Sequence, residues 1–420
     1  MKDRPSPTGG NSSKLEEENQ MAAKIAGIAV TVLLLVYGLT LILHISAHQD
    51  QYQWDFRTHR EAGKIMASGA NPYDADNLFP KARTGFLYTY PPVTLFFYRL
   101  FAIPTYKTAF HIFLIAKFLI LISLIYFWRK SFLKEDGGVL FYVFCLLAFN
   151  STIFLDMIAG NINLVQQALL WLGFSFYIKG KLKLFCLFTL LAAVFKITPI
   201  FFLVILLLSD AKDKYKYFFG AAAVFLAYLL IQYLIAPDLF TGFVKNALVV
   251  VGEQGGVVPS TYKLIAGIFE SIAKMAGAKI PKAFAAAVFC IIAAMVVYFS
   301  YKACLRLKQP TFENRAMLEV FMVCLVYALI QPRFKDYGYI LLLVPSYYII
   351  KNTRYTRIAP FLFLLFILSN RMLLPIAGFI YDTLWAYYPL MVAYCVWGIY
   401  LHEIFSPPNE PAVKPLTYGK

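Results

Sequence analysis

Charged residues are scarce in this sequence, and acidic residues are the scarcest. Only 15% of the 420 residues are Asp, Glu, Lys or Arg, and the acidic ones number 23 against 39 basic ones. A soluble domain has about a quarter of its residues charged, whereas here 60% are hydrophobic and the mean hydropathy is +0.64. This composition excludes an ordinary soluble domain and predicts a polytopic membrane protein. The apolar runs have the length of helices rather than of barrel strands, so the expected fold class is all-α.

Ligands for redox or metal chemistry are also few. The six cysteines have no CxxC spacing, and the five histidines form no HExxH or similar cluster. A disulfide framework and a zinc site are therefore not indicated, and we expect no metal and no cofactor. The net charge of +16 would suggest nucleic acid in a soluble protein, but the basic residues lie in short clusters between apolar runs. Membrane topology explains such clusters better, so no nucleic-acid partner is expected.

The apolar runs predict about twelve membrane elements within residues 25–404. Many of the short loops between them are rich in Lys and Arg, which is the pattern of cytosolic loops. Both termini are therefore expected in the cytosol, with a disordered polar segment over 1–24 and a tail over 405–420. The two long loops, 47–107 and 237–282, then face outside.

One apolar run, residues 184–208, has basic clusters on both flanks, so both of its ends are expected in the cytosol. Two half-helices that meet at Lys196-Ile197-Thr198-Pro199 satisfy this requirement. A lysine at such a turn costs on the order of 2.5–3.5 kcal/mol by insertion scales, which makes Lys196 a functional candidate. A lipid phosphate is one natural partner for it, and a snorkelling lysine is the alternative.

The first long loop combines a carboxylate with many aromatic rings. Asp55 follows the first apolar run by a few residues and lies between Trp54 and Phe56. A carboxylate at the membrane surface is placed to take a proton from a sugar or lipid hydroxyl. The alternative is a solvated loop acid. Glu61, six residues on, is expected to be structural.

Polar side chains also open the apolar run that begins near Ile162. Asn163, Gln166 and Gln167 share one face at helical spacing, and Asn161 precedes them. Contacts between helices explain these residues, and a water-filled cavity explains them equally well.

A very short loop that is expected outside contains Arg333, Lys335 and Asp336. Net positive charge on that side runs against the usual distribution of charge in loops. Anion binding is one explanation, and snorkelling to the membrane interface is the other.

The segment Asp74-Ala75-Asp76 matches the DxD pattern that holds a metal in many nucleotide-sugar transferases. It follows Pro72-Tyr73 in a polar loop, and short Asp-rich segments in that position are typical of turns. We therefore predict a turn here and no metal site.

In their order along the chain, these motifs resemble the GT-C membrane glycosyltransferases. They resemble most closely glycosyltransferase family 87, whose members are polyprenol-phosphate-mannose-dependent mannosyltransferases. The resemblance covers roughly residues 25–350 and rests on Asp55-Phe56, Asn71-Pro72-Tyr73, Tyr90-Pro91-Pro92, Gly160-Asn161-Ile162-Asn163-Leu164, Lys196-Ile197-Thr198-Pro199 and Pro332.

The resemblance implies a fold of eleven to thirteen helices with interfacial helices in the first external loop. It implies a polyprenyl-phosphate-linked sugar as donor, a glycolipid or glycan as acceptor, and inversion at the sugar carbon. On this chain, Asp55 would be the general base and Lys196 would hold the leaving phosphate. The substrate-binding residues would further include Asn161, Asn163, Arg333, Lys335, Asp336, Trp54 and Tyr90, with the aromatic rings stacking on sugar faces.

The leading hypothesis is thus a hexosyltransferase, with mannose implied by the resemblance, on the outer face of a prokaryotic cytoplasmic membrane. A transporter or flippase of a lipid-linked or anionic substrate would share the broken helix and the intramembrane lysine. However, the sequence has no internal repeat, and its ionisable residues gather in the loops. A non-catalytic assembly protein would not account for Asp55 beside so many aromatic residues.

Overall fold

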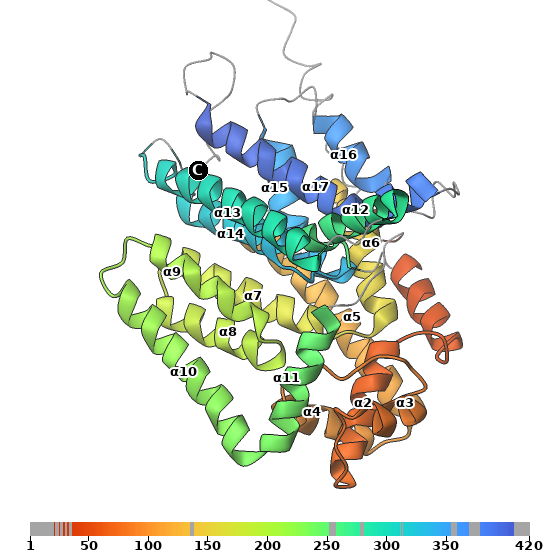
Figure 1. The fold of residues 1–420 in the computed structure, drawn as a ribbon. Coiled ribbons are helices and arrows are strands. Elements are labelled where there is room, and N and C mark those ends of the chain that lie inside the picture. Colours follow the sequence, from red (N-terminus) through yellow and green to blue (C-terminus); the bar gives the residue numbers. More distant parts are fainter. Residues whose placement is uncertain are drawn as a thin grey trace, which may run out of the picture.

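The computed structural model describes residues 36–134, 138–251, 258–277, 281–310, 314–353, 359–368 and 379–406, together with positions 21, 25, 28, 29, 32 and 312. Every regular element in these residues is a helix (Figure 1). Nearly all of the predicted disordered segment 1–24 and of the tail 405–420 lies outside the described residues, as do positions 252–257 and 278–280 of the second long loop.

Four helices of the described residues are long and apolar enough to cross a membrane: α5 (Tyr106–Ser131), α6 (Gly138–Ala159), α10 (Lys214–Ile235) and α13 (Lys282–Arg306). A polytopic all-α membrane protein fits this finding, while the larger number of spans expected from the sequence remains a prediction. The other helices are Val36–Ala47, α2 (Trp54–Ala67), α3 (Ala75–Ala82), α4 (Val93–Ala102), α7 (Asn163–Ile178), α8 (Leu182–Phe195), η1 (Thr198–Val204), α9 (Ile205–Leu208), α11 (Pro237–Val251), α12 (Thr261–Ala276), α14 (Arg315–Ile330), η2 (Asp336–Leu342), α15 (Leu343–Asn352), α16 (Ala359–Leu368) and α17 (Phe379–Phe405).

The first long loop folds into the short helices α2, α3 and α4, which lie together at one end of the fold (Figure 1). Helices α2 and α4 pack closely because Gly63 has no side chain: a Cβ there would lie 2.8 Å from the backbone nitrogen of Arg99. Arg60 fastens the same pair, since its guanidinium donates to the carbonyl oxygens of Phe101 at 2.9 Å and Pro104 at 2.7 Å. The loop is therefore a packed platform for the first turn of α2.

The predicted break at Lys196 is confirmed. Helix α8 ends at Phe195, Lys196 is extended with φ −154° and ψ 126°, and η1 begins at Thr198. Residues 180–184, 211–213 and Tyr217 line one common cavity, so the two ends of the segment lie at the same end of the fold. The segment is thus a hairpin with Lys196 at its turn.

Helix α6 contains a break that the sequence did not predict. Three consecutive residues other than glycine, Phe149, Asn150 and Ser151, have left-handed backbone angles, with φ of 54°, 58° and 57°. Such a conformation costs about 1–2 kcal/mol for each residue that carries a side chain. Directly after the break, the Thr152 hydroxyl donates to the carbonyl oxygen of Asp336 at 2.7 Å. The break thus accompanies a contact that holds the start of η2 against α6.

Candidate active site

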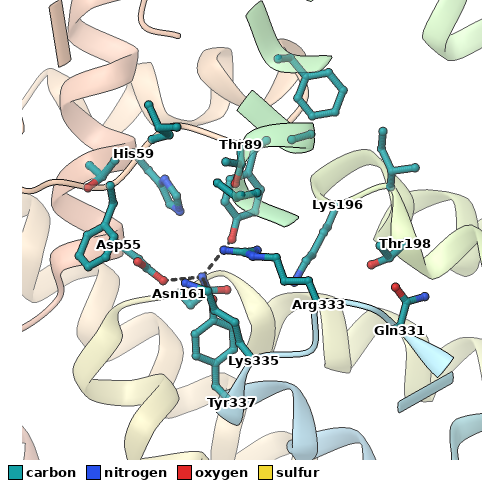
Figure 2. Close-up of a pocket in the computed structure, with 18 of the residues that line it drawn as sticks. Asp55, His59, Thr89, Asn161, Lys196, Thr198, Gln331, Arg333, Lys335 and Tyr337 are labelled. Atoms are coloured by element: carbon teal, nitrogen blue, oxygen red, sulfur yellow. Dashed lines mark hydrogen bonds between the residues drawn. The ribbon is translucent and has the colours of Figure 1, made fainter. Parts of the chain in front are cut away.

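A cavity of about 210 Å³ lies between the first-loop helices, the turn at Lys196, helix α11 and the segment 331–337 (Figure 2). Six residues singled out from the sequence line it together: Asp55, Tyr90, Asn161, Lys196, Arg333 and Lys335. Trp54, Asn163 and Asp336 are not among its lining residues. Asp336 is half-buried, and its Oδ1 atom is buried without a hydrogen-bond partner in the described part of the chain. Asn163 donates from Nδ2 to the carbonyl oxygen of Tyr337 at 2.8 Å.

Asp55 lies in the first turn of α2, where the helix dipole favours a negative side chain. Its side chain is nearly buried, with 8% of the residue exposed, and its Oδ2 atom accepts a hydrogen bond from Asn161 Nδ2 at 2.6 Å. Among the described residues that line the cavity, Asp55 is the one carboxylate. It is therefore the candidate for proton transfer at this site.

Asn161 connects Asp55 to two tyrosines. Its Nδ2 atom also lies 2.9 Å from the Tyr90 hydroxyl and 3.1 Å from the Tyr337 hydroxyl. An amide nitrogen has two hydrogens, so Asp55, at the shortest distance, and one tyrosine accept at a time. The amide oxygen of Asn161 accepts from the backbone nitrogen of Asn163 at 3.0 Å, which fixes the side-chain orientation. Gln166 and Gln167 are buried and do not line this cavity, and their Oε1 atoms have no hydrogen-bond partner among the described residues.

Gly160 makes the contact between Asn161 and Asp55 sterically feasible. It ends α6 with φ +70°, and a Cβ there would lie 2.8 Å from the Cβ of Gln53. The backbone nitrogen of Gln53 in turn donates to the carbonyl oxygen of Ile158 at 2.6 Å. The end of α6 therefore touches the start of α2 directly, and this contact brings the two side chains together.

A buried ion pair lies in the same part of the fold. Lys117 of α5 has its Nζ atom 2.7 Å from Oδ2 of Asp156 and 2.6 Å from the carbonyl oxygen of the same residue. The side chains are 1% and 0% exposed, respectively. The pair joins α5 to the last turn of α6, five residues before Asn161 in the connection to α7.

Three cations share the cavity with Asp55. Lys196 lies opposite Asp55, and the Arg333 side chain extends between them (Figure 2). Lys335 Nζ lies 5.9 Å from the ring centroids of both Phe86 and Tyr337, within range of a cation–π interaction. An excess of fixed cations in a partly enclosed space favours an anionic ligand. Of the two explanations for Arg333 and Lys335, their position favours anion binding.

Helix α11 forms a further wall of the cavity through Phe243, Ala247 and Val250. Asn246 fixes this helix on the first loop, because its Nδ2 atom donates to the carbonyl oxygens of Tyr73 at 2.8 Å and Tyr88 at 3.1 Å. The cavity thus has an apolar wall adjoining a cationic one.

Sequence reasoning missed His59, which also lines the cavity. It lies one helical turn after Asp55 on α2, so the i, i+4 spacing was the available signal. A single histidine without a cluster around it gave no reason to choose it. Burial lowers the pKa of His59 to about 4, against the opposing effect of the Asp55 charge.

The remaining candidates have structural roles. Asp74 caps α3, its carboxylate accepting from the backbone nitrogen of Asp76 at 3.3 Å, so the segment predicted to be a turn is the start of a helix. Glu61 accepts from Arg60 at 2.6 Å and holds it against the end of α4. No group of three His, Cys, Asp or Glu side chains in the described part of the chain is close enough to hold a metal ion.

The chain matches the family model of glycosyltransferase family 87 over residues 88–332, more than half of its length. The match includes Tyr90, Asn161 and Lys196, ends one residue before Arg333, and begins after Asp55 and His59. No curated protein matches the chain. On this match, which agrees with the resemblance found in the sequence, the chain belongs to glycosyltransferase family 87 and is a glycosyltransferase.

Proposed function

We propose that the protein transfers a hexose from a polyprenyl-phosphate sugar to a hydroxyl of a glycolipid or glycan, with Asp55 as the general base. Mannose is the sugar that the resemblance to the family implies. The observation that supports the proposal is the pairing, in one cavity, of a single carboxylate with Lys196, Arg333 and Lys335.

The reaction that this arrangement supports is a single displacement with inversion. The acceptor oxygen forms a bond to the anomeric carbon while Asp55 takes the proton of the acceptor hydroxyl. The bond from the anomeric carbon to the phosphate oxygen breaks, and the lipid phosphate leaves with the bonding electrons. The fixed cations stabilise the charge that grows on the phosphate. A single displacement needs no second carboxylate as a nucleophile, because no covalent glycosyl-enzyme intermediate forms.

The apolar wall on α11 suits the lipid part of the donor. Phe243, Ala247 and Val250 line the cavity, while Val244, Leu248 and Val249 on the same helix are exposed apolar residues. A prenyl chain that follows this helix would place its phosphate near Lys196. The transporter alternative loses its support, because membership of a glycosyltransferase family accounts for the broken segment without a transport cycle.

An assay of the purified protein in lipid nanodiscs tests the proposed function. Polyprenyl-phosphate sugars are incubated with candidate acceptors, and the products are identified by mass spectrometry. Asp55→Asn keeps the size of the side chain and removes the basic oxygen, so turnover should fall about 10²- to 10⁴-fold. Glu61→Gln is the matched control, because Glu61 is an acid of the same helix outside the cavity, and it should retain most of the turnover. If Asp55→Asn kept more than about a tenth of wild-type turnover, Asp55 would not be the base.

We further propose that the cavity opens on the outer face of the cytoplasmic membrane, with both termini in the cytosol. The Lys-rich loops support this orientation. In a cysteine-free background, Asp76→Cys and Lys179→Cys place single thiols at exposed positions of the first loop and of the α7–α8 turn. An impermeant thiol reagent added outside should label the first and not the second. The opposite result would place the cavity in the cytosol.

A further inference from the structure

His59 is a buried polar side chain for which the described part of the chain offers no hydrogen bond. The residue is 3% exposed, and neither Nδ1 nor Nε2 has a hydrogen-bond partner among the described residues. Three tyrosine rings surround the imidazole, with centroids at 4.5 Å for Tyr90, 4.8 Å for Tyr98 and 5.4 Å for Tyr88. Buried polar groups are nearly always paired, and each exception calls for an explanation.

The position of the ring supplies that explanation. His59 lies one turn after Asp55 on the same face of α2, and both line the cavity. The imidazole points into the space beside Asp55 and Thr89 (Figure 2). A ligand in contact with the Asp55 carboxylate would therefore also reach the imidazole.

The ring is available as both a donor and an acceptor. The charged groups around it are Asp55 and Lys335, and burial keeps its pKa far below neutrality. A neutral imidazole donates from one nitrogen and accepts at the other. A hydroxyl group, which does both, is the complementary partner, and a sugar ring carries several adjacent hydroxyls.

We propose that His59 determines acceptor specificity by hydrogen-bonding a second hydroxyl of the acceptor, next to the one that Asp55 deprotonates. This inference rests on the proposed function. His59 contacts the acceptor rather than the donor because it shares a helix with the base, Asp55. Lys196, which would hold the donor phosphate, lies across the cavity. The acceptor is then a ring with neighbouring hydroxyls, such as a hexose, and its apolar face packs on Tyr90, the one of these three tyrosines that lines the cavity.

A merely structural histidine would behave differently. A site built to hydrogen-bond a hydroxyl rejects the analogue that lacks it, because the buried group of the protein is then left unpaired. A space-filling ring gives no such discrimination. The response to removal of single hydroxyls from the acceptor therefore separates the two roles.

The experiment uses the full chain in nanodiscs with a polyprenyl-phosphate mannose and octyl glycosides of mannose, glucose and galactose. For the glycoside with the highest turnover, kcat and KM are measured with its monodeoxy analogues, for the wild type and His59→Phe. In the wild type, removal of the recognised hydroxyl should lower kcat/KM at least tenfold. In His59→Phe, kcat/KM for the parent acceptor should be lowered to a similar degree, the deoxy analogue should be no worse than the parent, and the donor KM should be unchanged.

His59→Gln can still hydrogen-bond and should recover part of the discrimination. His111→Phe is the control, since His111 lies on α5 with its Nδ1 atom 2.6 Å from the carbonyl oxygen of Lys107, away from the cavity. If His59→Phe discriminates between parent and deoxy acceptors as the wild type does, the role of His59 is refuted while the proposed function stands. If His59→Phe does not fold, the wild type alone still tests the role of His59. That role is refuted if removal of every non-reacting hydroxyl of the acceptor leaves the kcat/KM of the wild type unchanged. If the wild type transfers sugar to no acceptor, the proposed function fails, and the inference fails with it.

Discussion

Asn161 and Asp55 are 106 positions apart in the chain, and the Nδ2 atom of the first lies 2.6 Å from the Oδ2 atom of the second. This hydrogen bond joins the start of α2 to the connection between α6 and α7. In the described part of the chain, the other carboxylate oxygen of Asp55 has no protein hydrogen bond. Under the proposed function, this second oxygen is the one that takes the proton of the acceptor hydroxyl, and the hydrogen bond from Asn161 orients it.

Asn161→Leu should therefore lower kcat about 10²-fold, the cost of displacing a catalytic group by about 1 Å. The donor KM should change little, because Lys196 and Arg333 are untouched. Steady-state kinetics with either substrate varied measure both quantities. A kcat within a factor of two of the wild type would show that Asp55 is oriented by other contacts.

Replacement of Gly160 by alanine should lower both folding stability and turnover, because a Cβ there would clash with Gln53. Gly180 is a matched control, because its φ of +71° is nearly that of Gly160 and a Cβ there would meet nothing within 4 Å. Gly180→Ala should cost about 1–2 kcal/mol of folding free energy for the backbone alone. Gly160→Ala should cost about 1–3 kcal/mol more from overpacking, with loss of turnover. Thermal unfolding in nanodiscs compares them, and equal effects would contradict the role assigned to Gly160.

Lys196→Ala should raise the donor KM while leaving the acceptor KM nearly unchanged. The reason is that a charged contact to phosphate is lost from the wall opposite Asp55. Lys196→Arg keeps the charge and should recover part of the donor affinity. Lys64→Ala is the control, since Lys64 lies on the platform with its side chain 48% exposed. An unchanged donor KM in a folded Lys196→Ala protein would remove Lys196 from the phosphate site.

Chelation of divalent metals should leave activity intact. The fixed cations are proposed to do the work of a metal on the leaving phosphate, and Asp74 is a helix cap. Asp74→Ala should cost about 1 kcal/mol of local stability through loss of the cap, without loss of turnover. Activity that disappears in EDTA and returns with magnesium or manganese would contradict this prediction.

Asp336 should make stability depend on pH. Burial raises its pKa to about 7 from the ordinary value of 3.8, although Lys335 opposes the shift. The folded protein therefore binds more protons than the unfolded chain between these values, so the stabilisation is present below pH 3.8 and is lost as pH rises through 7. The melting temperature of the wild type should therefore fall relative to that of Asp336→Asn as the pH rises from 5 to 8. A difference that stays constant over this range would exclude the shift.

The sequence was sufficient to predict the all-α fold class and to identify residues that are energetically costly to place in an apolar segment. Lys196 was recognisable because a lysine in an apolar run is costly to insert into a membrane. The basic clusters on both flanks of that run predicted the turn that the structure has. The convergence of Asp55, Asn161 and Arg333 was not derivable from spacing, since it depends on which helices pack side by side. His59 was missed because its significance lies in the tyrosines around it, which come from α4 and from the loop that precedes it.

The break in α6 was missed for a related reason. Three polar residues, Asn150, Ser151 and Thr152, interrupt the apolar run, but no glycine or proline marks a change of backbone conformation. The break lies beside the contact of α6 with η2, which the sequence of α6 alone does not reveal. Trp54, Asn163 and Asp336 do not line the cavity although Asp55, Asn161 and Lys335 beside them in sequence do, because side chains that are neighbours in sequence often point in different directions.

The ion pair between Lys117 and Asp156 has a consequence for how the chain enters the membrane during synthesis. A lone lysine within a span costs on the order of 2.5–3.5 kcal/mol to insert, and Lys117 lies well inside α5. Its counter-ion comes from α6, the next helix to leave the ribosome. The two helices therefore enter the bilayer most cheaply as one hairpin, with the charges already joined. A nascent chain that stops before Asp156 leaves the lysine of α5 without its counter-ion, and such a truncated product is the one that we expect quality-control proteases to remove.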